Sequence, residues 1–154
     1  MTPAIDQLIS LGVHHKLHQY THDPQTASYG TEAAEKLAVT VQQVFKTLVV
    51  DTGHGVLAVA LVPVDQQLNL KLLAKALCVK KVAMADPVMV GRSTGYLLGG
   101  ISPMGQKRAL TTVIDTSAQG YASIYVSGGR RGLEIELKAG DLARVTHGWF
   151  ALIT

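Results

Sequence analysis

Two apolar segments in the middle of the chain predict a β-hairpin. Residues 44–50 and 56–62 are rich in β-branched side chains, and only Asp51-Thr52-Gly53-His54-Gly55 separates them. Short apolar runs joined by Asp, Gly and Thr are typical of two antiparallel strands connected by a tight turn. The fold of this chain therefore has to accommodate a hairpin whose strands are apolar along most of their length.

The segments around this hairpin predict short helices and strands without a regular β-α-β alternation. Capping and turn signals mark the helix ends, such as Thr2-Pro3 before the first helix and Asp86-Pro87 before a later one. We expect helices from Thr2 to Gly12, over 31–38, from Asn69 onward, after Asp86 and over 141–145, and strands over 14–20, 81–84, 110–115, 122–127 and 133–138.

This succession predicts an α+β fold with a mixed, largely antiparallel curved sheet flanked by short helices. The 154 residues, 47% of them hydrophobic, suffice for one good core but not for two. We therefore expect a single domain over residues 1–154. No apolar stretch approaches the roughly 20 residues that span a membrane, and a signal-peptide pattern is absent, so we expect a soluble, cytoplasmic protein without a membrane partner.

The lone cysteine and the charge distribution narrow the possible partners. Cys78 has no second cysteine to pair with, which fits a reducing compartment, and we expect it to be buried. The net charge of +3 is mild, but the basic residues are clustered. Such clusters are compatible with a phosphate-bearing ligand and equally with a solvated surface. The clusters comprise Lys71, Lys75, Lys80 and Lys81, and then Arg92, Lys107, Arg108, Arg130 and Arg131.

Lys46 is the only charged residue in the first strand of the predicted hairpin. Strand periodicity places its side chain on the same face as those of Leu48 and Val50, which is an expensive environment for an ammonium group. One interpretation is an edge-strand lysine whose head reaches solvent, and the run by itself favours that interpretation. The other is a cation held at a cleft where a negatively charged group binds.

Two glycine-rich segments are candidates for binding loops. Residues 95–107 contain four glycines and a proline, and glycine lets backbone N–H groups approach a carbonyl oxygen or a phosphate. The spacing matches neither a P-loop nor a dinucleotide fingerprint. A tight structural turn is an equally good interpretation of this segment. The second segment, 127–132, reads as a hairpin connection, or else as a turn that places Ser127 in the same cleft as Gly99.

The histidines do not predict a metal site. His14, His18 and His22 would share one face of a strand, but residues four apart on a strand are separated by roughly 13 Å, too far for one ion. The sequence likewise contains no pattern typical of a nucleophile elbow. We therefore predict no metal and no cofactor.

Three segments together resemble the bacterial YbaK family. They are Phe45-Lys46-Thr47-Leu48, the run from Ser93 through Lys107, and Tyr125-Val126-Ser127-Gly128-Gly129. Met1-Thr2-Pro3-Ala4 and Tyr20-Thr21-His22-Asp23-Pro24 are similar to the family as well, so the resemblance spans nearly the whole sequence. The YbaK family consists of Cys-tRNA(Pro) deacylases related to the editing domain inserted in bacterial prolyl-tRNA synthetases.

The resemblance implies an α+β domain that frees tRNA(Pro) from mischarged cysteine in trans. It implies that Lys46 is the key site residue and that the loop matching Gly99, Gly100, Ile101, Ser102 and Pro103 supplies N–H groups near the scissile carbonyl. Our own hypothesis is that Lys46 holds the terminal phosphate or the reacting ester and that the Gly99 and Gly100 N–H groups bind the oxyanion. It also implies that Tyr20 and Ser127 line the pocket around the terminal adenosine. Arg130, Arg131 and Glu134 are not carried over from the family.

The resemblance further implies that the thiol of the substrate attacks the ester to give a cyclic thiolactone, so that no protein nucleophile, metal or cofactor is required. This fits a chain with a cation and glycine-rich backbone but no evident nucleophile. The implied partners are Cys-tRNA(Pro) as substrate and prolyl-tRNA synthetase as the source of tRNA specificity.

Two other functions stay open at this point. One is a non-catalytic tRNA-binding or regulatory module, and the other is a serine esterase acting through Ser102 or Ser127. The sequence favours the esterase least.

Overall fold

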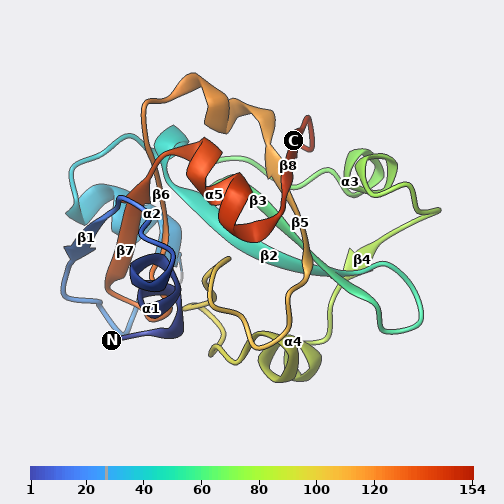
Figure 1. The fold of residues 1–154 in the computed structure, drawn as a ribbon, viewed down its shortest axis with the longest axis horizontal. Helices are drawn as coiled ribbons and strands as arrows, with labels where there is room; N and C mark the ends of the chain where they lie inside the picture. The colour runs from blue at the N-terminus through green and yellow to red at the C-terminus, as the bar shows by residue number, and fades with distance from the viewer. Residues whose placement is uncertain (27) are drawn as a thin grey trace.

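The strands form two neighbouring sheets. The computed structural model describes residues 1–26 and 28–154, and within these residues a five-stranded sheet has the order β4-β2-β3-β5-β8 and a three-stranded sheet has the order β1-β7-β6 (Figure 1). The strands are β1 (Lys16–Gln19), β2 (Phe45–Asp51), β3 (Leu57–Pro63), β4 (Ala83–Met84), β5 (Thr111–Asp115), β6 (Ile124–Ser127), β7 (Leu133–Leu137) and β8 (Trp149–Ala151).

The predicted hairpin is the centre of the larger sheet. Strands β2 and β3 pair antiparallel along seven residues, from Phe45 opposite Pro63 to Asp51 opposite Leu57. The pairs β3–β5 and β5–β8 are parallel, and the remaining ladders are antiparallel. The expected α+β class with a mixed, largely antiparallel sheet is therefore confirmed. The strands divide between two sheets, and neither sheet closes into a barrel in the described residues.

Short helices flank the sheets, and their starts follow the capping signals of the sequence. The Thr2 hydroxyl accepts the Ile5 N–H at 3.4 Å before α1, and the Asn69 side chain accepts the Leu72 N–H at 3.0 Å before α3. The helices are α1 (Pro3–Ser10), α2 (Tyr29–Lys36), α3 (Leu70–Ala76), α4 (Pro87–Thr94) and α5 (Ala139–Thr146), with 3₁₀ turns η1 (Val41–Gln43) and η2 (Thr116–Gly120).

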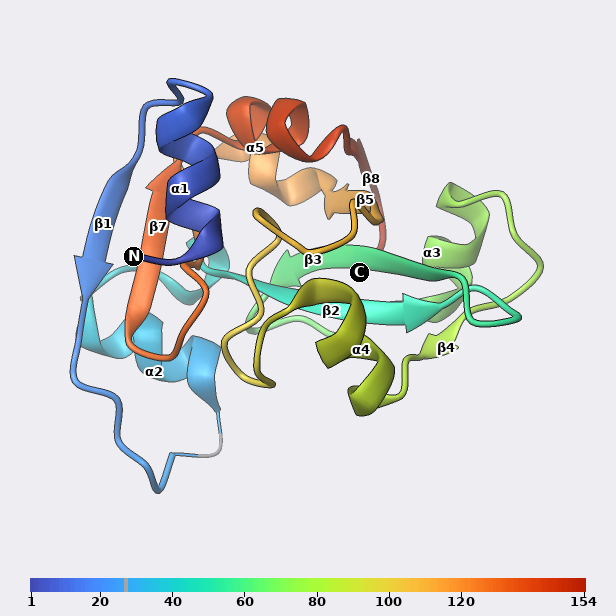
Figure 2. The same ribbon diagram turned by 60° about the horizontal axis from the view of Figure 1, so that its bottom comes forward.

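The two faces of the hairpin are covered by different elements. Phe45 and Val49 of β2 belong to an apolar cluster that includes Ile135 of the smaller sheet and residues of α1 and α5. The opposite face contributes Val50 to a second cluster with Leu73 of α3. Figure 2 shows α1 and α5 on one side of the hairpin and α3 beside its far end. The side chains of Lys46 and Phe45 point to opposite faces of β2. Lys46 therefore lies on the face that α3 covers near Val50.

Some local features differ from the sequence-based expectations. The short strand β8 and the turn η2 were not predicted, and α2 begins two residues earlier than expected. Cys78 is exposed rather than buried, because it follows the last turn of α3 in a left-handed conformation with φ 57°. None of the described helices has the length and apolarity needed to cross a membrane.

Candidate functional site

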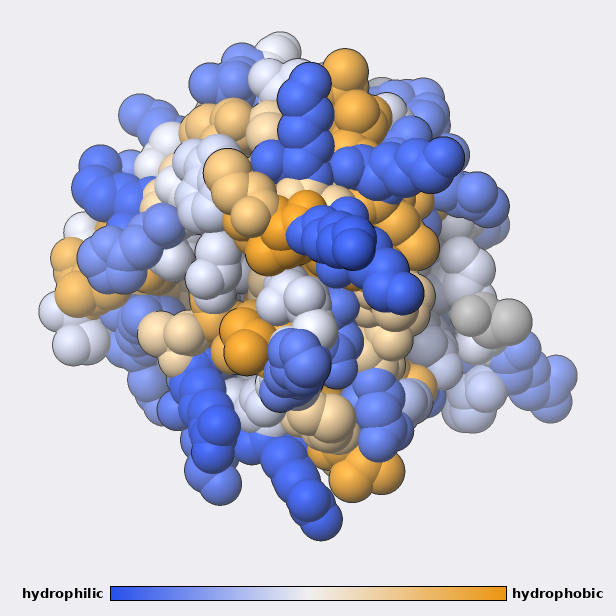
Figure 3. Space-filling model, turned by 90° about the vertical axis from the view of Figure 1, so that its right-hand side faces the viewer, coloured by the Kyte–Doolittle hydropathy of each residue, from blue (hydrophilic) through white to orange (hydrophobic). Residues whose placement is uncertain are grey.

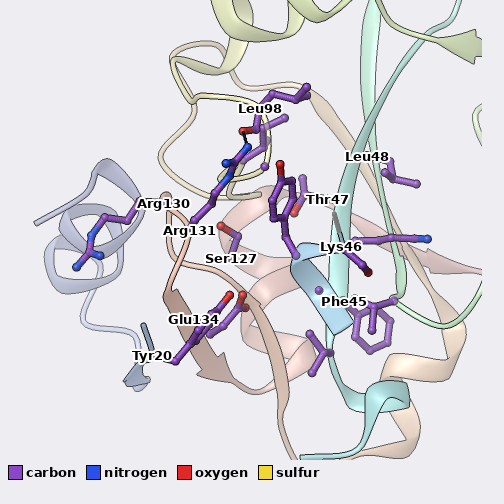
Figure 4. A pocket seen from close by; sticks show the side chains of 17 residues that line it. Tyr20, Phe45, Lys46, Thr47, Leu48, Leu98, Ser127, Arg130, Arg131 and Glu134 are labelled. Atoms are coloured by element: carbon purple, nitrogen blue, oxygen red, sulfur yellow. Dashed lines mark hydrogen bonds between the residues drawn. The ribbon is translucent and has the colours of Figure 1, made fainter. Parts of the chain in front are cut away.

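A cavity of about 360 Å³ lies where the two sheets separate. The sheets touch through an isolated parallel bridge between Val44 and Tyr125. Just beyond that bridge, residues 45–48 of β2 form one wall, and Ser127 and Glu134 of the smaller sheet form the opposite wall (Figure 4). The loop between α4 and β5 contributes Leu98, Gly99 and Ile101. The cavity thus collects residues from segments that are far apart in the sequence.

The structure brings most of the predicted site residues together. Those that line the cavity are Tyr20, Lys46, Gly99, Ile101 and Ser127. Their assembly depends on the bridge between the sheets and on the main chain around Tyr20, whose N–H donates to the Gly132 carbonyl at 2.9 Å.

Three predicted residues lie behind the cavity wall rather than on it. Gly100, Ser102 and Pro103 are buried and do not line the cavity. The Gly100 N–H donates to the Leu97 carbonyl at 3.0 Å, so it is not free to bind an oxyanion. No hydrogen bond within residues 1–26 and 28–154 engages the Gly99 N–H. Gly99 is therefore the member of the expected donor pair that this structure leaves available.

Lys46 is half-buried and has no ion pair among the described residues. Burial lowers the pKa of its ammonium group, and the negative charge of Asp65 acts in the opposite direction. In Figure 4 the Lys46 nitrogen lies on the side of β2 away from Ser127 and Glu134. A half-desolvated cation without a counter-ion can bind a negatively charged group at little reorganisation cost.

Glu134 is a buried carboxyl group on the opposite wall, and the sequence did not mark it as a site residue. It is 8% exposed and lies directly across from Ser127 in the β6–β7 ladder. Burial raises its pKa to about 8, so the group is largely protonated at neutral pH. Within residues 1–26 and 28–154, its Oε2 has no hydrogen-bond partner, and neither has the buried Oγ1 of Thr47 on the facing wall. Buried polar atoms are normally paired, so two unpaired ones on one cavity indicate a ligand that supplies the partners.

Tyr20 is a neutral hydrogen-bonding group of the wall. Burial, and then the charges of Glu134 and Glu32, raise the pKa of its phenol to about 12. Its hydroxyl keeps its proton at any physiological pH and is a poor nucleophile.

A stacked pair of side chains holds the glycine loop against the cavity. The Arg131 guanidinium lies 4.0 Å from the ring centroid of Tyr29 and donates to the Leu98 carbonyl at 3.2 Å. A Cβ on Gly99 would lie 2.6 Å from the Arg131 Nε and 2.7 Å from the Tyr29 ring, and the φ of Gly99 is +87°. Glycine is thus required here both for its conformation and for the close approach of the stacked pair.

Replacing Gly99 by alanine should displace Arg131 from Tyr29 and destabilise the protein by about 1–2 kcal/mol. Urea unfolding measures this change. The matched control is Gly140→Ala in α5, where the new Cβ meets open space and the effect should be neutral or slightly stabilising. Equal stability of Gly99→Ala and the wild type would contradict this account of the loop.

The described lining of the cavity does not fit a serine esterase. No histidine is among these lining residues, and the Ser102 hydroxyl is buried behind the wall, 3.4 Å from the Met104 N–H that donates to it. In the part of the chain that the structure describes, no group of three or more His, Cys, Asp or Glu side chains is arranged to hold a metal ion.

Comparisons with known proteins identify the family. The model of the aminoacyl-tRNA editing domain matches residues 23–145. A protein of Enterococcus faecalis (strain ATCC 700802 / V583), named EbsC and described as a candidate Cys-tRNA(Pro)/Cys-tRNA(Cys) deacylase, is 42% identical over 121 residues, or 79% of this chain and 74% of that protein. This chain belongs to the aminoacyl-tRNA editing domain family, as the resemblance to YbaK proteins predicted.

Solved structures show the same fold. A crystal structure described as a candidate trans-editing enzyme for prolyl tRNA synthetase superposes with a TM-score of 0.85 at 23% identity, covering 100% of this chain and 98% of that one. A crystal structure of a hypothetical protein gives 0.86 at 23% identity, with 98% of each chain covered.

Proposed function

We propose that this protein is a trans-editing deacylase that cleaves the aminoacyl ester of Cys-tRNA(Pro). Family membership and the relative described as a Cys-tRNA deacylase support the substrate class. The observation that carries the proposal is the cavity itself, whose lining includes Lys46, a cation without an ion pair among the described residues, and buried polar atoms of Glu134 and Thr47 that have no hydrogen-bond partner there. The aminoacylated terminal nucleotide of a tRNA offers a phosphate, an ester and an ammonium group to such a cavity.

In the proposed reaction the nucleophile comes from the substrate. The cysteine thiol loses its proton, a bond forms between its sulfur and the ester carbonyl carbon, and the bond from that carbon to the ribose oxygen breaks. The ribose oxygen takes up a proton, so the products are free tRNA and a cyclic thiolactone. The protein positions the two groups and stabilises the negative charge on the carbonyl oxygen.

The residues of the cavity divide these tasks in the proposal. Lys46 holds the terminal phosphate or the reacting ester by its charge, and the Gly99 N–H donates to the oxyanion. Tyr20 and Ser127 contact the terminal adenosine. Glu134 is the one carboxyl group among the described residues that line the cavity, and it accepts a hydrogen bond from the substrate ammonium, which stabilises its ionised form. Such a deacylase would act in the cytoplasm, where translation takes place.

Selection for cysteine then follows from the chemistry. An amino acid without a thiol at the right reach cannot cyclise, so it is not released even if it enters the cavity. Selection for tRNA(Pro) is assigned to prolyl-tRNA synthetase, which we propose as the partner that delivers the substrate.

The experiment is to incubate the protein with Cys-tRNA(Pro) and, in parallel, with Ala-tRNA(Pro), and to follow loss of each ester with and without prolyl-tRNA synthetase. We expect rapid loss of the cysteinyl ester and little loss of the alanyl ester. Retained affinity for tRNA without loss of either ester would establish the binding module instead.

A further inference from the structure

A second hollow lies beside α3, at the far end of the hairpin from the cavity. It measures about 280 Å³, and four lysine side chains surround a floor of apolar residues. We call it the lysine groove. Its lysines are Lys71, Lys75, Lys80 and Lys81, and its floor is formed by Leu70, Ala74, Val79 and Val82.

Positive charge predominates in the lysine groove. Between Asp65 and Asp86 the sequence contains the four lysines and no carboxylate. All four lysines are exposed, and none forms an ion pair in the described part of the chain. Figure 3 shows the side of the molecule where α3 and β4 lie, with hydrophilic side chains projecting around apolar surface. Four like charges around one hollow attract a polyanion.

The lysine groove and Lys46 belong to the same face of the larger sheet. Lys46 and Val50 are both on the face of β2 that α3 covers, and Val50 packs with Leu73. Strand β4, which follows the groove in the sequence, pairs Met84 with Val50. Lys46 and Val50 lie four positions apart along the strand, which corresponds to roughly 13 Å. A nucleic-acid strand advances about 3.4 Å per nucleotide, so this distance is about four nucleotides.

We propose that the lysine groove binds the phosphate backbone of the tRNA whose aminoacylated end occupies the cavity. The proposal rests on the proposed function, because it identifies the polyanion as the rest of the same substrate. Lysines bind phosphates as point charges without reading sequence, and the apolar floor can take a sugar or a base. The groove therefore adds affinity for any tRNA and leaves discrimination between tRNAs to another element.

The test compares two triple variants that lose the same charge. Lys75, Lys80 and Lys81 are changed to Gln in one, and the exposed residues Lys16, Lys138 and Arg144, on β1 and around α5, in the other. Binding of uncharged tRNA(Pro) is measured at several salt concentrations. We expect the groove variant to bind about 10–100-fold more weakly at low salt, with a log–log salt slope reduced by roughly 2–3, and the control variant to stay close to the wild type.

A truncated substrate separates the groove from the chemistry. The cysteinyl ester of adenosine cannot reach the groove, so wild type and both variants should cleave it equally, which also shows that the variants are folded. If the groove variant binds tRNA with the affinity and salt slope of the wild type, the proposal is wrong. It is also wrong if that variant still binds tRNA but no longer binds prolyl-tRNA synthetase. A wild-type protein that binds tRNA through the groove yet cleaves no cysteinyl ester would instead refute the proposed function.

Discussion

Replacing Lys46 by alanine should abolish deacylation of Cys-tRNA(Pro) while leaving the fold intact. Lys46 is the half-buried cation on the β2 wall of the cavity, and it forms no ion pair among the described residues. Removing one preorganised electrostatic contact to a developing charge costs about 10²–10³ in rate. Single-turnover deacylation with the enzyme in excess measures the effect without interference from product release.

Lys46→Met separates the charge from the rest of the side chain. Methionine keeps an unbranched stem next to Leu48 and Val50, so the packing on the α3 face is preserved. Because burial lowers the pKa of Lys46, its charge costs stability, and Lys46→Met should be at least as stable as the wild type while losing activity.

The control for this experiment is Lys16→Met, an exposed lysine on β1 that lies outside the cavity. It should change neither activity nor stability by a measurable amount. Near-wild-type deacylation by Lys46→Ala and Lys46→Met would remove Lys46 from the mechanism.

Local patterns were sufficient to predict most of the fold. The hairpin was predicted because both of its strands are apolar runs on either side of a glycine-containing turn, and these signals lie within twenty residues of each other. The helix starts at Thr2, Asn69 and Asp86 were predicted because each cap is formed by a side chain next to the helix that it caps.

The division into two sheets could not be predicted in this way. It depends on strand pairs such as Lys16 with Glu136, which lie far apart in the sequence. The strand β8 was missed because its three residues pair only with β5 and carry no turn signal of their own. Cys78 was expected in the core because small hydrophobes are usually buried, but its left-handed backbone places it outside.

The candidate site could be predicted only in part, because some of its features depend on contacts between distant segments. The motif around Lys46 and the glycine loop can be recognised within short segments, whereas the hydrogen bonding of the Gly100 N–H and the burial of Glu134 depend on the folded structure. The Gly100 N–H donates a turn hydrogen bond to the Leu97 carbonyl. Glu134 alternates with Leu133 and Ile135 along β7, a pattern typical of a solvent-facing residue, yet in the folded protein it is only 8% exposed.

Glu134→Gln should stabilise the protein at alkaline pH. Burial raises the pKa of Glu134 from its ordinary value near 4.5 to about 8, so the folded state binds a proton that the unfolded state releases between these values. Stability contributed by this group is therefore full below about pH 4.5 and is lost as the pH rises to about 8. Such a shift corresponds to on the order of 3–5 kcal/mol.

The neutral amide of glutamine has the same shape as the protonated carboxyl group but cannot ionise. Urea unfolding between pH 5 and pH 9 should therefore show a falling stability for the wild type relative to Glu134→Gln, with the gap largest above pH 8. A gap that does not change with pH would contradict the raised pKa of Glu134.

Glu136→Gln is the matched control, because Glu136 lies two residues further along β7 and has the opposite shift. Hydrogen bonds from Ser123 and His18 lower the pKa of Glu136. Its replacement should destabilise the protein at neutral pH, and this loss should disappear as the pH falls below the ordinary carboxyl range. Two carboxyl groups on one strand should thus give pH profiles of opposite sign.

Glu134→Gln also tests why a destabilising carboxyl group is present in the cavity. If Glu134 accepts the ammonium of the aminoacyl group, Glu134→Gln should be more stable and yet cleave Cys-tRNA(Pro) more slowly, mainly through a higher KM, because an amide oxygen binds a cation less strongly than a carboxylate. A variant that is more stable and fully active would show that Glu134 does not contact the substrate. Stability and activity that change in opposite directions would place Glu134 in the binding site, because loss of a purely structural residue lowers both.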